Sequence, residues 1–326
     1  MSKVIGIDIS KQTFDVSFRA HNKVLHKVYT NSTKGFKQFI NSIANTDDIV
    51  VVMEASGPYY VCLATYLYKC QVKISVVNPL IIKRFSQMKF YRAKTDKKDA
   101  FMIMEYGETA FTSLLPWQPE SQGVQTLKQM QTSLELLQKQ VRQSKNQLAA
   151  FRSSGIINKE VEKSLKAVIK ATEKSIQLIE IQMLDTCDKY YQENLSLLTS
   201  IPSIGKKTAM MLIAITDNFS KFKHYKQLIA YVGLAPRVYQ SGTSVRGKGH
   251  ICKMGKSQIR KLLYMCSWTA KYYNKTCKRM YERLKAKGKP EKVIKIAIAN
   301  KLLKQAFAVA TTKQKYIENY QPNTCF

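Results

Sequence analysis

Short apolar runs succeed one another through the first 77 residues in an order that few folds share. The first three runs have the pattern of strands, and they span Lys3–Ser10, Thr13–Phe18 and Val24–Tyr29. Helical and strand patterns then alternate, as helix 33–43, strand 48–54, helix 59–68 and strand 72–77, before Asn78-Pro79 breaks the chain. Three antiparallel strands followed by alternating helices and parallel strands predict a ribonuclease-H-like α/β domain.

Two of these predicted strands carry a carboxylate near the end, Asp8 in the first and Glu54 in the fourth. A buried strand rarely holds a carboxylate unless that group is paired or bound to a metal ion. In a ribonuclease-H-like sheet the two positions would lie close together. The alternative is structural, with Asp8 in a turn with Ser10 and Glu54 in a capping contact near Gly57-Pro58.

Asp96 and Asp99 stand three residues apart inside strongly basic sequence, and no Asp or Glu occurs from Ala55 through Thr95. On a helix this spacing places both carboxylates on one face, where they could share a divalent cation. The alternative is a helix start, with Asp96 as the N-cap and Asp99 at N3. All four carboxylates together could bind Mg²⁺ or Mn²⁺, and two such ions about 4 Å apart can clamp the attacking and leaving oxygens of a phosphodiester.

The charge and cysteine content limit the partners and the compartment. Lys and Arg number 53 against 22 Asp and Glu, and the net charge of +31 is spread along the chain, which indicates a nucleic-acid partner. No apolar run approaches about 18 residues and no signal-peptide layout is present, so we predict a cytosolic protein without membrane contact. Seven cysteines without a Cys-x-x-Cys pair support neither a disulfide framework nor a zinc site. A chain of 326 residues with 45% apolar content can bury two ordinary cores.

A heptad pattern begins after Ser121. Apolar side chains recur at alternating steps of three and four, with only the position near Ser144 missing, at Leu127, Met130, Leu134, Leu137, Val141, Leu148 and Phe151. After the break at Ser153-Ser154-Gly155, the pattern continues from Val161 to Met183 in a second helix of similar length. The two helices could fold back as an antiparallel hairpin or pair with another subunit, and we interpret them as a spacer and oligomerisation element.

The segment Leu198–Ala209 has the pattern of a helix-hairpin-helix turn, in which N–H groups at a helix N-terminus bind a phosphate. An ordinary connection between two helices is the alternative. Farther on, segments 257–273 and 292–311 are predicted to be amphipathic helices with basic outer faces.

Between these elements, Tyr231–Gly255 is rich in glycine and serine. From Asn218 through Tyr281 the chain contains 14 Lys and Arg and no Asp or Glu, so this region cannot assemble a carboxylate metal site of its own. A serine hydroxyl near Arg237, Arg246 and Lys248 would combine a nucleophile with the positive charge that phosphoryl transfer needs. A hairpin that only grips a DNA backbone is the alternative, and we assign His250 no role.

Several motifs in this sequence are shared with one family. They are Gly6–Lys11, Glu54–Tyr59, Asn78-Pro79, Lys94–Ala100, Ile201–Gly205, Gly233–Arg237, and Ser241-Gly242 through Lys253–Gly255. With these motifs the chain resembles, over nearly its whole length, the DEDD transposases of the insertion sequence 110 family, the bridge-RNA-guided recombinases. Two residues depart from the family pattern: Pro58, and Ser203 in place of a common glycine, which weakens the phosphate-binding argument in that turn.

The resemblance implies three domains: a RuvC-like, ribonuclease-H-like domain at 1–118, a coiled-coil helical hairpin at 119–194 and a mainly α-helical transposase domain at 195–326. It implies that Mg²⁺ is bound by the catalytic carboxylates Asp8, Glu54, Asp96 and Asp99. It also implies that Ser241 is the serine that becomes linked to DNA. The basic residues predicted to contact nucleic acid are Arg92, Lys94, Lys206, Lys207, Arg237, Arg246, Lys248 and Lys253.

The resemblance further implies a donor and a target DNA, a structured guide RNA encoded by the element, and a dimer or tetramer in the bacterial cytoplasm at the nucleoid. Since the region of Ser241 lacks acids, we expect the metal to come from the RuvC-like domain of a neighbouring subunit. Two other functions stay open: a metal-dependent nuclease of the junction-resolvase type, and a nucleic-acid-binding scaffold without enzymatic activity.

Overall fold

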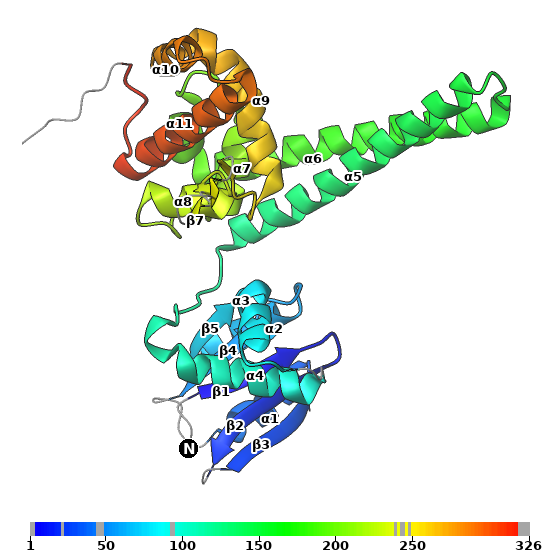
Figure 1. The fold of residues 1–326 in the computed structure, drawn as a ribbon. Helices are drawn as coiled ribbons and strands as arrows, with labels where there is room; N and C mark the ends of the chain where they lie inside the picture. The colour runs from blue at the N-terminus through cyan, green and yellow to red at the C-terminus, as the bar shows by residue number, and fades with distance from the viewer. Residues whose placement is uncertain are drawn as a thin grey trace, which may run out of the picture. The chain divides into compact units, whose positions relative to one another are not determined.

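The computed structural model describes residues 4–20, 23–43, 49–91, 95–237, 240–241, 245–246 and 249–318. The chain divides into two compact units, Met1–Pro119 and Glu120–Phe326 (Figure 1). The first unit is a mixed α/β domain and the second is mostly helical. The predicted combination of an α/β N-terminal part and a mainly α-helical C-terminal part is therefore confirmed.

The first unit is built on a five-stranded sheet with the strand order β3-β2-β1-β4-β5. Its strands are β1 (Val4–Ile9), β2 (Thr13–Ala20), β3 (Lys23–Thr30), β4 (Val50–Glu54) and β5 (Lys73–Val77). Strand β2 is antiparallel to both β1 and β3, while β4 is parallel to β1 and to β5. Its helices are α1 (Thr33–Asn41), α2 (Tyr60–Lys69), α3 (Pro79–Met88) and α4 (Asp96–Thr109), with a short 3₁₀ turn at Phe111–Ser113.

Alternation along the strands gives this sheet a core on each face. Side chains of odd-numbered positions in β1, such as Ile5 and Ile7, pack with residues of α1 and α2 such as Phe39 and Leu63. Even-numbered Val4 packs on the opposite side with residues of α3 and α4. The carboxylate of Asp8 shares the even-numbered positions and so belongs to the face that α4 covers.

Helix α3 was not expected, because Asn78-Pro79 was interpreted as a chain breaker. In the structure these residues begin a helix: the Asn78 side chain accepts a hydrogen bond from Leu80 N at 2.9 Å, and Pro79 occupies the first helical turn. Proline is well tolerated there because its missing N–H would have no partner within the helix. Asn78 and Pro79 therefore follow β5 directly and begin α3.

The second unit contains seven described helices and four two-residue strands. The helices are α5 (Gln122–Ser153), α6 (Lys159–Thr199), α7 (Lys206–Thr216), α8 (Tyr225–Val232), α9 (Ser257–Tyr273), α10 (Lys275–Ala286) and α11 (Glu291–Thr312). The strands are β6 (Pro236–Arg237), β7 (Gln240–Ser241), β8 (Val245–Arg246) and β9 (His250–Ile251). Helices α9 and α11 match the two predicted amphipathic helices, whereas α10 was not predicted. The long helices α5 and α6 lie side by side (Figure 1).

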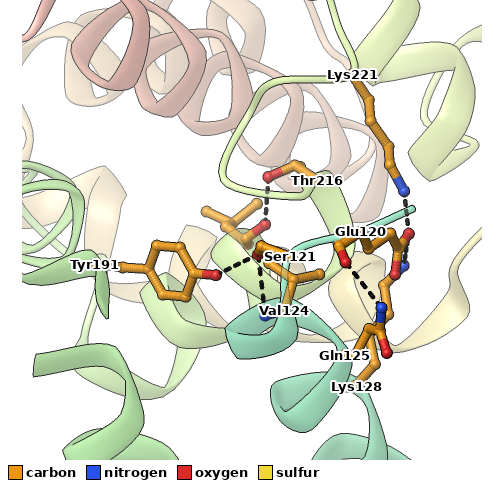
Figure 2. Close-up of polar contacts among 9 residues, drawn as sticks. Glu120, Ser121, Val124, Gln125, Lys128, Tyr191, Thr216 and Lys221 are labelled. Carbon is orange, nitrogen blue, oxygen red and sulfur yellow. Dashed lines mark hydrogen bonds and ion pairs between the residues drawn. The ribbon is translucent and has the colours of Figure 1, made fainter. Parts of the chain in front are cut away.

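The start of α5 is tied to the rest of the second unit by the cluster in Figure 2. Glu120 forms ion pairs with Lys128 on α5 and with Lys221, which follows α7. Beside it, the hydroxyls of Ser121 and Tyr191 are hydrogen-bonded at 2.7 Å. Tyr191 is also the residue at which α6 departs from helical geometry, so the kink in α6 and the start of α5 are held together.

Candidate active site

A close crossing of α4 over β1 positions the four predicted carboxylates of the first unit. A Cβ added to Gly6 would lie 2.2 Å from Met104 N and 2.3 Å from Ala100 O, so only glycine lets the helix backbone rest directly on the strand. Farther along, a Cβ on Gly107 would meet Val4 at 2.7 Å. Helix α4 therefore runs opposite to β1, and its first turn points toward the end of β1 where Asp8 lies.

Glu54 approaches the same end of the sheet from the neighbouring parallel strand. Ile7 pairs with Met53, and the next residue on each strand is Asp8 and Glu54. Both carboxylates therefore lie at the carboxyl ends of adjacent parallel strands. Parallel strands of open α/β sheets place their functional groups at this edge.

The first turn of α4 supplies the other two carboxylates. Thr95 is the N-cap, and its hydroxyl accepts a hydrogen bond from Lys98 N at 3.3 Å. Asp96 and Asp99 follow inside the first turn, so the alternative in which Asp96 is the N-cap is wrong. Asp96 is exposed and Asp99 is half-buried. Carboxylates in a first turn are stabilised by the positive end of the helix dipole, which lets α4 tolerate both.

The four carboxylates act on one another electrostatically. Burial, together with the negative charges of Asp99, Glu54 and Asp96, raises the pKa of Asp8 to about 6. Like charges raise the pKa of a carboxyl group because the protonated form avoids their repulsion. The strands and α4 thus bring all four predicted residues to one side of the sheet.

An all-oxygen set of this type suits a hard divalent cation such as Mg²⁺. Within the residues that the structure describes, however, no three Asp, Glu, His or Cys side chains come close enough together to form a metal site. The donor chemistry fits a cation, and a cation would relieve the repulsion that raises the pKa of Asp8. The side-chain positions do not form a coordination shell.

Asp15 and His26 lie beside this group and were missed in the sequence. Asp15 is directly opposite Asp8 on β2, it is only 9% exposed, and its Oδ1 lies 2.7 Å from His26 Nε2 on β3. The signal that could have revealed it is the alternation in β2, which places Asp15 on the same face as Asp8. The partner of Asp15 depends on strand register, which the sequence leaves open.

The second unit holds Ser241 in a short hairpin, where Ser241 pairs with Val245 across β7 and β8. A second pair, β6 with β9, joins Arg237 to His250 at the base of this hairpin. Gly255, at φ +132°, supports the base as well, because a Cβ there would lie 2.1 Å from the carbonyl oxygen of Tyr231. Gly255 thus allows a close backbone approach, whereas a Cβ on Gly249 would meet nothing within 4 Å.

The predicted nucleic-acid contacts are only partly described. Arg92, Lys94 and Lys248 lie outside the described residues, as does Ser244, and Arg246 is described as a strand residue without its side chain. Arg237, Lys206 and Lys253 are exposed. Lys207 is exposed too, but it forms an ion pair with Glu180 on α6.

The turn before α7 has an unusual residue at its centre. Ser203 adopts φ +80°, a left-handed conformation that favours glycine. Gly205 is the N-cap of α7 and provides no side-chain hydrogen bond to the first turn. Whether this turn binds phosphate as a helix-hairpin-helix stays a prediction.

None of the described helices is long and apolar enough to cross a membrane.

Comparisons with known proteins agree with the two-part organisation. A transposase family model matches residues 5–151, and a model described as "Transposase IS116/IS110/IS902 family" matches residues 195–282. The pilin gene-inverting protein of Moraxella bovis is 34% identical over 318 residues, covering 95% of this chain and 96% of that protein. The transposase for insertion sequence element IS1111A of Coxiella burnetii is 25% identical, with 80% and 76% of the two chains covered. The transposase for IS1328 of Yersinia enterocolitica is 23% identical, with 94% and 96% covered.

Proposed function

The chain belongs to the IS110 family of transposases, and we propose that it cuts and rejoins DNA by phosphoryl transfer, using four carboxylates of the first unit and a serine of the second. The observation that carries this proposal is the position of Asp8 and Glu54 at the carboxyl ends of adjacent parallel strands, with Asp96 and Asp99 in the first turn of the helix that crosses β1. The raised pKa of Asp8, caused by its burial and by the charges of Asp99, Glu54 and Asp96, agrees with it. Perturbed carboxylates gathered at the ends of parallel strands are typical of functional sites.

Asp8, Glu54, Asp96 and Asp99 are the residues that would hold a divalent cation in a RuvC-like site. Such a cation would stabilise negative charge on the phosphoryl oxygens and on the leaving oxygen. Half-buried Asp8 and Asp99 would hold negative charge near each other, and that concentration of charge is what would attract the cation.

Ser241 is the proposed nucleophile. Its hydroxyl oxygen attacks the phosphorus of a DNA strand and loses its proton, a serine–phosphate ester forms, and the bond to one deoxyribose oxygen breaks. Attack by a second DNA strand then reverses these steps and releases the serine, so no bond energy is lost between cutting and joining. Exposed Arg237 precedes Ser241 by four residues in the chain and can contribute positive charge to the reacting phosphate.

The partners follow from the charge and from the family. The net charge of +31 suits long contacts with DNA and with a structured guide RNA, and the long helices α5 and α6 suit a coiled-coil role in a dimer or tetramer. The relative from Moraxella bovis is named for inverting a pilin gene. By analogy we expect this chain to catalyse complete strand exchange on donor and target DNA in the bacterial cytoplasm, at the nucleoid, rather than cutting alone.

The test compares three variants in a strand-exchange assay that also detects covalent protein–DNA adducts. Ser241→Ala should abolish both exchange and adduct, and Asp99→Asn should abolish exchange. Ser244→Ala, a serine three residues away, serves as the matched control and should retain most of the activity.

Three outcomes would contradict the proposal. Metal-dependent cleavage that survives in Ser241→Ala would indicate a nuclease of the junction-resolvase type. Normal DNA chemistry in Asp99→Asn would remove the carboxylates from the reaction, and the absence of any chemistry in the wild-type protein would favour a scaffold.

A further inference from the structure

Phe90 occupies a backbone conformation that a bulky residue rarely adopts, at the end of α3. Its φ is +56°, and its side chain is 85% exposed. Phe219 has a similar φ of +67°, but its side chain is 4% exposed and packs on Phe307, so burial offsets the strain. Phe90 gains no comparable burial within the part of the chain that the structure describes.

The conformation of Phe90 is held from both sides. Lys89 Nζ lies 2.9 Å from Glu105 Oε1, and Tyr91 OH lies 2.8 Å from Glu105 Oε2, so one carboxylate on α4 anchors both neighbours. The amide of Tyr91 also donates to Ser86 O at 3.2 Å. A left-handed residue after a helix is normally glycine or asparagine. Here the anchors hold a phenylalanine in that position, and strain kept in place by its surroundings is a feature of functional sites.

Phe90 has an exposed apolar neighbour and is surrounded by positively charged side chains. Met88 is 61% exposed beside it, and Lys83, Arg84 and Lys89 belong to the same helix and its end. The sequence contains no acid from Ala55 through Thr95, and Glu105 is engaged by Lys89 and Tyr91. An exposed ring within positive charge is complementary to a nucleobase on its phosphate backbone, and less so to an apolar protein surface.

The anchor of Phe90 also lies near the carboxylates. Glu105 follows Asp99 by six residues on α4, which is about 9 Å along the helix axis. That length corresponds to about three base steps of a stacked strand. A strand whose phosphate lies at the carboxylates can therefore have a base within reach of the loop that carries Phe90.

We propose that Phe90 is a stacking residue for an unpaired base of single-stranded DNA or of a locally opened strand that enters the carboxylate site. This inference rests on the proposed function, since it names the form of nucleic acid that the same site receives. Phe90 would hold the strand by the face of one base, without selecting its sequence, because every base offers an aromatic face.

The first experiment measures binding of a fluorescein-labelled mixed-sequence single strand and of its duplex to the full-length protein by anisotropy. Elevated salt weakens the contacts of this basic chain with phosphates, so that the contribution of base stacking to the affinity can be measured. Phe90→Ala should weaken single-strand binding about tenfold and duplex binding far less. Phe90→Trp should retain single-strand binding, and Met88→Ala, which removes an exposed neighbour, should change it less than about twofold.

Phe90→Gly supplies a second measurement that does not depend on DNA chemistry. Glycine accepts the positive φ without strain, so this variant should unfold at a higher Tm than the wild type while binding the single strand as weakly as Phe90→Ala. Crosslinking from 5-iodouracil in the single strand should join the peptide that contains Phe90 in the wild type.

The inference is overturned if Phe90→Ala binds the single strand as tightly as the wild type does. It is also overturned if the substitution lowers the affinity for single strand and for duplex by the same factor, or if sedimentation shows that Phe90→Ala dissociates an oligomer. Any of these results leaves the strand-exchange test of Ser241 and Asp99 unaffected. Conversely, if the strand-exchange test contradicts the proposed recombinase function, the measured affinity for the single strand still stands.

Discussion

Asp8 illustrates, for a single residue, how the candidate site is built and how it lowers the stability of the fold. The residue lies among buried positions of β1, and its even-numbered position turns it toward the first turn of α4 instead of the α1 and α2 side. Burial and the three neighbouring carboxylates both favour its protonated form. Residues that serve function commonly reduce stability in this way.

This argument predicts the pH dependence of the first unit. The pKa of Asp8 is raised from 3.8 to about 6, so its stabilising contribution is full at low pH and is lost as pH rises through about 6. Asp8→Asn should therefore raise the Tm of the first unit at about pH 8 and change it little at about pH 4. Thermal unfolding followed by circular dichroism at the two values measures the difference.

The matched control for this prediction is Asp185→Asn, at an exposed position on α6, which should change the Tm little at either pH. A wild-type Tm that is independent of pH in this range, together with an Asp8→Asn variant no more stable at about pH 8, would show that Asp8 is not in the field of the other carboxylates.

Individual residues also show which parts of the site can be inferred from sequence alone. Asp8 and Glu54 stand out because each carries charge near the end of an apolar run, and Asp96 with Asp99 because the surrounding sequence is basic. Asp15 and His26 do not stand out, since their 2.7 Å contact exists only in one register of β2 against β3. Phe90 does not stand out in the sequence either, because neither its exposure nor its positive φ is signalled by a local sequence motif.

At the scale of elements, the well-predicted ones have strong periodicity. The strands of the first unit follow from apolar patterns with a period near two, and helix α9 follows from a pattern with a period near 3.6. Helix α3 was missed because Asn-Pro both ends and begins helices. Helix α10 was missed because five of its twelve residues are lysine or arginine and only Cys277 is fully buried, so its apolar stripe is narrow.

The turn between α6 and α7 allows a prediction about its departure from the family pattern. Ser203 has φ +80°, and its hydroxyl is buried without a hydrogen-bond partner among the described residues. Ser203→Gly should relieve the left-handed strain and remove the buried hydroxyl, and thus raise the free energy of unfolding of the second unit by about 1 kcal/mol. Urea denaturation measures this change.

Ser203→Ala separates the two causes in the same experiment. Alanine removes the hydroxyl but keeps the strained backbone, so its gain should be smaller than that of glycine. If alanine and glycine stabilise equally, the buried hydroxyl and not the backbone is the source of the cost. If glycine destabilises the protein, the left-handed conformation of Ser203 is not the native one.

At the scale of the whole molecule, the carboxylates and the serine to which we assign the reaction belong to different units. Asp8, Glu54, Asp96 and Asp99 lie in the unit that ends at Pro119, and Ser241 lies in the unit that begins at Glu120. The sequence from Asn218 through Tyr281 has no acid that could supply a metal ligand close to Ser241 in the chain. An oligomer with the symmetry usual for identical subunits could therefore combine the carboxylates of one subunit with the serine of another.

Complementation between two inactive variants tests this arrangement. Asp99→Asn subunits keep the serine, and Ser241→Ala subunits keep the carboxylates, so each protein alone should be inactive in strand exchange. If a site is shared between subunits, mixing the two in equal amounts should restore about a quarter of the wild-type sites, because half of random dimers are mixed and one of their two sites is intact. If each site is built within one chain, the mixture should stay inactive. Sedimentation of differently labelled subunits must show that they exchange. If the site is shared between subunits, dilution of the wild-type protein to monomers should also abolish its activity.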